Sequence, residues 1–203
     1  AARRSLFMPV NRSVPDVAQK RKNWNGLISG FSASDLVFLD ESGCNTDMTR
    51  RYAYSFGGSR AVDSTPLSKP KNTTILSSIQ LNGTLHYTTF SGGTTVERFK
   101  RYLETDLLPH LNGNSVLIMD NMKSHHARAV KNLLDSLGIR YIYLPPYSPD
   151  LNPIEKLWSK VKAFLRKFKA RTLDALPNAI QNAFHSVTVS DCSGWFRFCG
   201  YVL

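Results

Sequence analysis

The apolar positions in the first half of the chain follow the short spacing of β-strands. A continuous apolar run ending in an acid, typical of a buried strand, occurs in LVFLD (36–40). An alternating pattern predicts a second strand at RYAYSFGG (51–58), with ESGCN as the intervening turn. Two further strands are predicted within TTILSSIQLNGTLHYTTF (73–90). Their junction is Asn82-Gly83, and Asn-Gly is the strongest short hairpin signal.

Helical spacing then begins to alternate with short strands. A capping-box pattern, Thr94 followed by Glu97, predicts the start of a helix. Buried strands are predicted at SVLIMD (115–120) and IRYIYL (139–144). Between them, Ser124 is positioned to cap a further helix. The region between residues 94 and 144 therefore has the alternation of an α/β fold.

The chain then passes through a proline-rich loop, LPPYSPDLNP, into a long amphipathic stretch. Its apolar stripe predicts a helix and consists of Ile154, Leu157, Trp158, Val161, Leu165 and Phe168. A last helix is predicted over 173–186, and partial helix over 17–26. Together these elements predict an α/β fold, a mixed sheet flanked by helices, in one domain over 35–203. Residues 1–34 are interpreted as a basic lead-in or linker.

The net charge narrows the possible classes of function more than the amino-acid composition does. The 203 residues include 26 Lys and Arg against 15 Asp and Glu, a formal net charge of +11. Such a field attracts polyanions, most often nucleic acid, less often an acidic membrane face. No run approaches the ~20 apolar residues that would cross a bilayer, so we expect no membrane partner. Three unpaired cysteines argue against a disulfide framework or a standard zinc site and suggest a reducing, cytosolic setting.

Two carboxylates stand where chemistry is expected in an α/β fold. Asp40 and Asp120 each close an apolar strand, and the carboxyl ends of strands gather ligands and catalytic groups. Neighbouring carboxylates repel each other unless a cation lies between them, and oxygen ligands favour Mg²⁺ or Mn²⁺. Two neighbouring hard cations are the usual catalysts of nucleophilic displacement at phosphorus. The alternative is that each Asp only makes an Asx turn or caps the next element.

A third acid, Glu155, follows the proline-rich loop. Asn152 suits an N-cap, Pro153 the first helical position, and Glu155 the third, which favours a capping role on local evidence. The helix N-terminus also favours the ionised carboxylate that a metal ligand needs, so both roles are compatible. The prolines restrict the loop, and we interpret this rigidity as setting the position of Glu155 relative to the two aspartates.

Basic and polar neighbours surround these acids in sequence. On the helix after Glu155, a solvated face or a DNA-phosphate contact is expected for Lys156, Lys160, Lys162 and Arg166. Turn residues or side chains that orient the ligands are expected at Glu41, Asn121, His125 and Asn152. Asp150 competes with Glu155 as a ligand, but a turn role suits it better.

At this point the chain resembles a known family. VFLDESG, VLIMDNMKSHH and LPPYSPDLNPIEKLWSKVK resemble, in order, the catalytic blocks of bacterial insertion-sequence transposases of the mariner superfamily. The 34 residues between Asp120 and Glu155 match that group's Asp-Asp-Glu spacing. PDVAQKRKNW, TTFSGGTTVERFKRYLE and CSGWFRFCGY extend the resemblance from about residue 12 to the C-terminus.

The resemblance implies a ribonuclease H-like fold and a metal-dependent reaction on double-stranded DNA. Two Mg²⁺ (or Mn²⁺) ions would be held by Asp40, at the end of the first strand, Asp120, at the end of the fourth, and Glu155. They would serve cleavage and strand transfer at transposon ends and into target DNA. Lys71, in KNTTIL, is a weaker match to a basic position in relatives.

One difference between this chain and the family that it resembles leaves other functions open. Such transposases carry an N-terminal helix-turn-helix region that binds the transposon ends, and fewer than 40 residues precede Asp40 here. A split reading frame or a truncated copy is therefore expected in a bacterial cytoplasm, near the nucleoid. A separate helix-turn-helix polypeptide and a homodimer are its expected partners. The alternatives are a catalytically silent DNA-binding remnant and another ribonuclease H-like DNA nuclease.

Overall fold

The computed structural model describes residues 15–49, 54–62, 64 and 72–201. The strands are β1 (Leu36–Cys44), β2 (Thr73–Gln80), β3 (Leu85–Ser91), β4 (Val116–Met119) and β5 (Arg140–Tyr143). The α-helices are α1 (Pro15–Ile28), α2 (Val96–Tyr102), α3 (Arg128–Ser136), α4 (Ile154–Phe168), α5 (Ala175–His185) and α6 (Val189–Phe198). A π-helical turn (Leu103–Leu107) extends α2, and three single 3₁₀ turns lie at Ala33–Asp35, Leu108–His110 and Pro149–Leu151.

All five strands belong to one mixed sheet with the order β3-β2-β1-β4-β5. β1, β2 and β3 form an antiparallel meander, whereas β4 and β5 lie parallel to β1. A parallel pair needs a crossover, and α3 supplies the one between β4 and β5. The predicted α/β class with a mixed sheet flanked by helices is confirmed.

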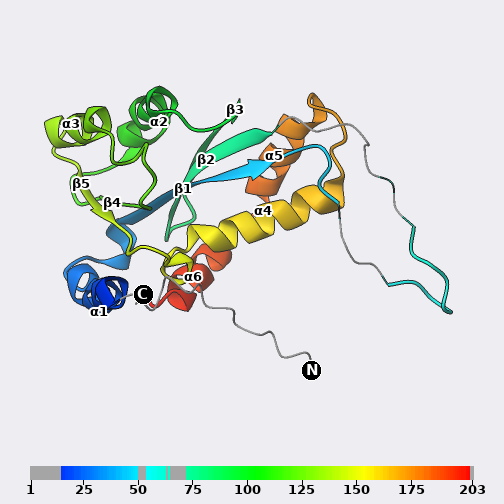
Figure 1. Ribbon diagram of the computed structural model, residues 1–203, viewed down its shortest axis with the longest axis horizontal. Coiled ribbons are helices and arrows are strands. Elements are labelled where there is room, and N and C mark those ends of the chain that lie inside the picture. Colours follow the sequence, from blue (N-terminus) through cyan, green and yellow to red (C-terminus); the bar gives the residue numbers. More distant parts are fainter. Residues whose placement is uncertain (1–14, 50–53, 63, 65–71, 202–203) are drawn as a thin grey trace.

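The sheet separates two layers of helices, as Figure 1 shows, and an apolar cluster lies on each of its faces. Side chains alternate along β1, so Val37 and Leu39 join the cluster formed with α2 and α3. Leu36 and Phe38 join the opposite cluster, to which α1, α4, α5 and α6 contribute. The long helix α4 crosses this second face of the sheet. Any polar side chain that continues the Leu36–Phe38 alternation therefore points toward α4.

The strand predictions hold except around the β1–β2 connection. β1 continues through the predicted ESGCN turn to Cys44, because the whole of β2 pairs with it, from Val37↔Gln80 to Cys44↔Thr73. The predicted strand at 51–58 is wrong over its described part. Tyr54–Gly58 are exposed and lack strand structure, and Gly57 and Gly58 adopt positive φ. This segment projects away from the body of the molecule.

Two helix starts differ from their predicted caps. Thr95, not Thr94, caps α2 and accepts a hydrogen bond from the Arg98 N–H. Ser124 caps no helix, because residues 123–126 form turns and α3 begins only at Arg128. At α2 two adjacent threonines offer the same cap and the second is used, whereas α3 begins after Ala127 without a side-chain cap.

The C-terminal end adds a helix beyond the last predicted one. The predicted 173–186 helix is α5, and α6 follows it after a short turn. Thr188 and Asp191 form a reciprocal capping box at its start. This Thr-x-x-Asp pattern was the sequence signal for α6. The aromatic-rich stretch behind it lacks a clean helical stripe, which explains why periodicity missed the helix.

The N-terminal helix is packed into the core. α1 is longer at both ends than the predicted 17–26 helix, and its Trp24 and Ile28 are buried in the cluster on the α4 face. Within the described residues no helix combines the length and apolar character that a membrane span requires. Cys44, Cys192 and Cys199 are all buried and free, as the absence of a disulfide pattern predicted.

Candidate active site

The register of the sheet brings the two aspartates together. The parallel β1–β4 ladder runs from Leu36↔Val116 to Leu39↔Met119, so Asp40 and Asp120 follow at the same level. Both continue the alternation that faces α4. Asp40 lies inside β1 rather than at its end, but it is the first residue beyond the parallel ladder. The chain therefore places two carboxylates side by side although 79 residues separate them in sequence.

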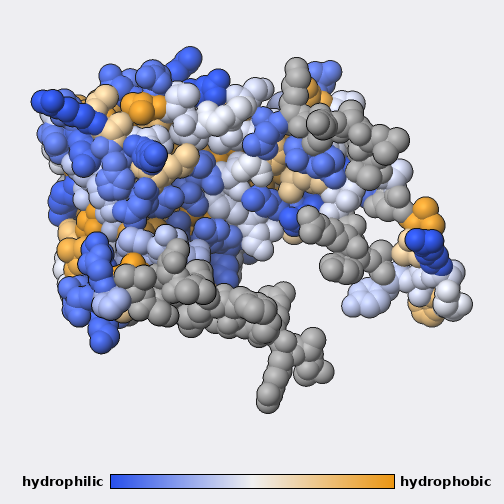
Figure 2. All heavy atoms as spheres, viewed as in Figure 1, coloured by the Kyte–Doolittle hydropathy of each residue, from blue (hydrophilic) through white to orange (hydrophobic). Residues whose placement is uncertain are grey.

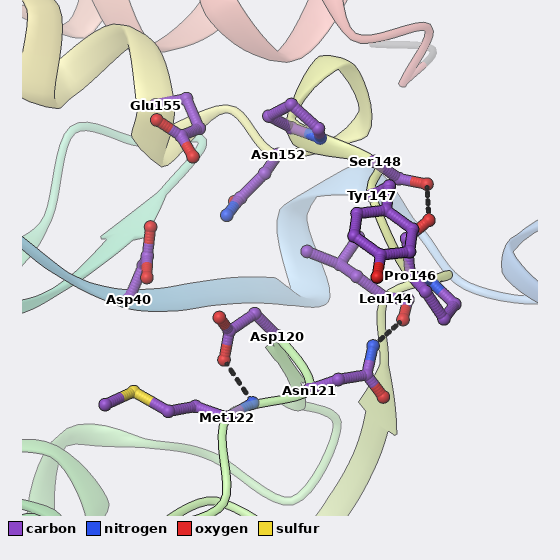
Figure 3. Close-up of a pocket in the computed structure, with 11 residues that line it drawn as sticks. Asp40, Asp120, Asn121, Met122, Leu144, Pro146, Tyr147, Ser148, Asn152 and Glu155 are labelled. Carbon is purple, nitrogen blue, oxygen red and sulfur yellow. Dashed lines mark hydrogen bonds between the residues drawn. The ribbon is translucent and has the colours of Figure 1, made fainter. Parts of the chain in front are cut away.

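Glu155 reaches the same place from the first turn of α4. Ile154, Leu157 and Trp158 are buried against the sheet, and burying each such side chain contributes about 1.5–3 kcal/mol. This packing fixes the N-terminal end of α4 beside the aspartates. In Figure 3 the Asp40 carboxylate lies between those of Asp120 and Glu155.

The three acids line one cleft of about 550 Å³. The other lining residues are Asn121, Met122, Leu144, Pro146, Tyr147, Ser148, Pro149 and Asn152. The proline-rich loop thus forms one wall of the cleft, with β1 and the β4 end opposite. Of the predicted ligands and ligand-orienting residues, Asp40, Asp120, Glu155, Asn121 and Asn152 meet here.

Asp40 carries the most perturbed carboxyl of the site. Burial, followed by the negative charge of Asp120, raises its pKa to about 7. Its Oδ1 accepts a hydrogen bond from the Glu41 N–H at 2.8 Å, and its Oδ2 accepts one from Trp158 Nε1 at 3.2 Å. Burial also raises the pKa of Glu155, partly offset by nearby Lys162. Within the described residues, no basic side chain offsets the burial of Asp40, whereas Lys162 does so in part for Glu155.

Asp120 has a different environment because a buried histidine stands behind it. His125 is fully buried, with Nδ1 2.7 Å from Asp120 Oδ1 and Nε2 3.2 Å from Glu41 Oε2. The distances are those of ion pairs, although the angles are not those of hydrogen bonds. Burial alone would lower the pKa of His125, but the two carboxylates raise it to about 9. Burial would raise the pKa of Asp120, and His125 instead brings it below its ordinary value.

The two predicted asparagines hold the walls of the cleft in different ways. Asn121 Nδ2 donates to the Leu144 carbonyl at 2.6 Å, which ties the residue after Asp120 to the start of the proline-rich loop. The expected Asn152 side-chain cap is absent, because its Oδ1 is buried without a hydrogen-bond partner. Its N–H donates to Pro149 O, so it is not available to the Glu155 carboxylate either. The predicted capping box is therefore wrong, and Glu155 faces the cleft.

The basic residues predicted on α4 do not share one environment. Lys162 lies near enough to Glu155 to influence its titration, whereas Lys160 forms an ion pair with Asp191. The Lys156 ammonium stands 3.8 Å from the centre of the Phe198 ring. Arg166 is half-buried further along the helix. Lys71 lies outside the described residues. Figure 2 shows a largely hydrophilic face with separate apolar spots.

Sequence reasoning missed two contributions to the site. Trp158 was expected in the core, where it is, but its indole N–H also binds Asp40. Arg21, one of several basic residues near the N-terminus, contacts the proline-rich loop through Ser148 and Asp150. Asp150 therefore has the turn role expected of it. No local pattern signals either contact, because each joins segments more than 100 residues apart.

The donor set fits hard divalent cations. Three carboxylates surround the cleft, and the unpartnered Asn152 Oδ1 adds a neutral oxygen; oxygen ligands are those that Mg²⁺ and Mn²⁺ prefer. Within the described part of the chain, no three His, Cys, Asp or Glu side chains already converge on a single ion position. The residues that could hold such ions are therefore Asp40, Asp120 and Glu155, with Asn152 beside them.

The signature of the DDE superfamily endonucleases matches residues 35–177, and the chain belongs to this family. The Caenorhabditis elegans transposable element Tc1 transposase is 28% identical over 97 residues, covering 46% of this chain and 36% of that protein. The chain thus matches about a third of the length of this relative.

Solved structures place the fold more closely. The Mos1 transposase paired-end complex with left transposon end superimposes with a TM-score of 0.81, at 18% identity, over 97% of this chain and 62% of that one. The Mos1 transposase catalytic domain with raltegravir and Mg gives a TM-score of 0.65, at 18% identity, over 91% of this chain and 90% of that one. The expected ribonuclease H-like fold is thereby confirmed, since the chain superimposes on the Mos1 transposase catalytic domain.

Proposed function

We propose that this chain is the catalytic domain of a DDE transposase that cleaves transposon-end DNA and joins it to a target. The observation that most directly supports this proposal is that three carboxylates on separate elements surround one cleft, with Asp40 between the other two. The insertion-sequence origin that the three sequence blocks resemble is part of this proposal. Support comes from the family, and from relatives described with transposon-end DNA and with Mg.

Asp40, Asp120 and Glu155 would hold two divalent ions. Asp40 lies between the other two acids, so it would contribute to holding both ions, together with Asp120 and Glu155. When bound, such a pair activates an attacking oxygen and stabilises the leaving oxygen of a phosphodiester. The raised pKa of Asp40 reflects a carboxylate whose ionised form needs a cation.

The surrounding residues orient these carboxylates. Met122 N–H donates to Asp120 Oδ1 at 3.0 Å, and His125 approaches the same oxygen from behind. The second oxygen of Asp120 is thereby left toward the cleft. Trp158 fixes Asp40 in the same way, through its indole N–H. We propose that Glu41 and Asn121 support this arrangement, and that Asn152 adds an oxygen beside Glu155.

The basic residues of α4 would hold the DNA that the cleft receives. A polyanion cannot approach three carboxylates closely without neighbouring cations. Lys162 and Arg166 supply positive charge on the helix that carries Glu155. Lys156, Lys160 and Lys71 remain candidates for further phosphate contacts. The homodimer and a separate helix-turn-helix polypeptide are proposed partners for recognising two transposon ends.

The test is cleavage of a duplex carrying the terminal sequences of the element that encodes this chain. Asp120→Asn should lower Mg²⁺-dependent cleavage by about 10³-fold, the scale of removing one preorganised electrostatic group. Asp174→Asn is the matched control, because Asp174 is an exposed acid at the N-cap of α5 and does not line the cleft. Full activity of Asp120→Asn would disprove the assignment.

The products then separate the proposed function from its alternatives. Joined products between transposon end and target DNA support a transposase, while hydrolysis confined to branched DNA would indicate a different nuclease. Calorimetry with Mn²⁺ alone tests the remnant hypothesis. Wild type should bind Mn²⁺, whereas Asp40→Asn and Glu155→Gln should bind it at least about 10-fold more weakly.

A further inference from the structure

The helix α1 is bound to the proline-rich loop by a bidentate ion pair. Arg21 Nη2 donates to Asp150 Oδ2 at 2.7 Å, and Nη1 donates to Asp150 Oδ1 at 3.2 Å. Nη1 also contacts Ser148 Oγ, and this serine donates to the Pro146 carbonyl at 3.1 Å. The Arg21 side chain is 20% exposed and Ser148 is buried. A planar guanidinium in this fork geometry fixes direction as well as distance.

The contacted turn leads directly into the helix that carries Glu155. Consecutive backbone hydrogen bonds run from Leu151 N to Ser148 O, from Asn152 N to Pro149 O, and from Glu155 N to Asn152 O. The loop also contains Tyr147 at φ +55°, a conformation that non-glycine residues rarely keep without support from their surroundings. Contacts that fix Ser148 and Asp150 therefore also restrict the position of Glu155, which follows Ser148 by seven residues.

A second connection joins the same elements. Trp24 Nε1, one turn after Arg21 on α1, donates to Tyr201 Oη at 3.3 Å. Tyr201 Oη donates in turn to the Leu151 carbonyl at 2.6 Å. Both Trp24 and Tyr201 are buried. The loop is thus anchored directly by Arg21 of α1 and by Tyr201 near the end of the chain, and Trp24 of α1 reaches it indirectly through Tyr201.

We propose that Arg21 is a positioning residue for the active site: through Asp150 and Ser148 it fixes the loop that sets Glu155 against the two aspartates. The inference rests on the proposed metal-binding role of Glu155. It assigns a function to α1, which lies outside the family signature at residues 35–177. Because Asp150 neutralises the guanidinium, the effect is on the geometry of the cleft rather than on attraction of DNA.

The experiment compares Arg21→Ala with Lys22→Ala in the full chain. Lys22 is the next residue of α1 and is exposed, and its replacement by alanine removes the same charge. Arg21→Ala should weaken Mn²⁺ binding by calorimetry about 10-fold, the scale of losing a residue that supports a metal ligand. It should lower kcat of cleavage with little change in KM for DNA. Lys22→Ala should leave Mn²⁺ affinity unchanged.

Two further measurements separate positioning from general stability. Amide exchange over residues 147–156 should rise in Arg21→Ala while exchange over β1 stays the same. The reversed pair Arg21→Asp with Asp150→Arg should recover Mn²⁺ affinity to within about threefold of wild type, since a coupled pair is not additive. Should Arg21→Ala fail to fold, Arg21→Lys keeps the charge, loses the fork, and should show the same weakening in part.

The outcomes distinguish this inference from the proposed function. If Asp120→Asn abolishes Mn²⁺ binding but Arg21→Ala changes neither affinity nor exchange in the loop, the positioning role alone is wrong. Equal loss of DNA affinity in Arg21→Ala and Lys22→Ala, with unchanged Mn²⁺ binding, would likewise overturn it and indicate a phosphate contact. If wild type binds no Mn²⁺, the proposed function fails and this positioning role with it.

Discussion

At the scale of single residues, Asp40 shows how the fold sets the properties of a side chain. Its carboxyl is 9% exposed, adjoins Asp120, and accepts hydrogen bonds from Glu41 N–H and Trp158. Burial and the neighbouring charge outweigh those two donors, so the pKa is raised. A carboxylate in this state is costly to the folded protein unless a cation compensates it.

This cost predicts an unusual dependence of stability on pH. The pKa of Asp40 rises from 3.8 to about 7 on folding, so between these values the folded state binds more protons than the unfolded state. The free energy of unfolding should therefore fall as pH rises through that window. At roughly 1.4 kcal/mol per pKa unit the loss approaches about 4 kcal/mol. Urea denaturation in EDTA from pH 5 to 8 measures it.

The variant Asp40→Asn provides the control for this measurement. It should remove the loss of stability below pH 7. The loss at higher pH should remain, because His125 has a pKa raised to about 9 and its stabilising charge disappears as pH rises toward that value. An identical pH profile for wild type and Asp40→Asn would contradict the environment described for Asp40.

At the scale of elements, the β2–β3 hairpin meets α6 at a glycine. Gly83 has φ +89°, and a Cβ there would lie 3.0 Å from Val189 Cγ2 and 3.4 Å from Val189 Cα. The Asn-Gly signal therefore reports two requirements: the positive φ of the turn and the close approach of α6. Only the first is a local property of the sequence.

Gly83→Ala should consequently lower the free energy of unfolding by about 1–3 kcal/mol, through strain at positive φ and through overpacking. The second variant Val189→Ala removes the nearest methyl and should recover part of this loss. Gly113→Ala is the control, because that residue has open space around its Cβ position and should change stability by less than about 0.5 kcal/mol. A neutral Gly83→Ala would contradict the contact between hairpin and α6.

At the scale of the whole molecule, the net charge of +11 acts through the charges that remain unpaired. Lys160 is held by Asp191, whose pKa is lowered mainly by that contact. Within the described residues, Lys162 and Arg166 form no ion pair. Both stand on α4, the helix of Glu155, and Lys162 is close enough to act on Glu155 itself.

Salt dependence of DNA binding tests this difference. Each phosphate neutralised contributes about −0.9 to the slope of log K against log salt concentration. Lys162→Ala or Arg166→Ala should therefore reduce the slope by about one, measured by anisotropy on a short duplex. Lys160→Ala should change it by clearly less, because Asp191 already neutralises that ammonium. Equal changes for all three would show that Lys160 leaves Asp191 to bind DNA.

Local patterns were sufficient for most elements and for the chemical character of the site. Apolar runs ending in an acid located β1 and β4, the Asn-Gly dipeptide located the hairpin, and helical spacing located α4 and α5. The same patterns made Asp40 and Asp120 candidates, because each follows a strongly marked strand, whereas for Glu155 they favoured a capping role; the structure brings all three to one cleft. They failed where a residue had several local uses, as with the expected cap at Asn152 and the turn that became the end of β1.

What the sequence by itself determined is which residues could carry the chemistry and on which elements they stand. The tertiary structure alone decided that Asp40 and Asp120 lie at one level of the sheet, that Trp158 binds Asp40, and that Arg21 holds the loop before Glu155. The physical reason is the distance along the sequence that each kind of interaction spans. Periodicity and capping report interactions within a few residues, whereas these contacts join distant segments and exist only after the sheet and its two apolar layers have formed.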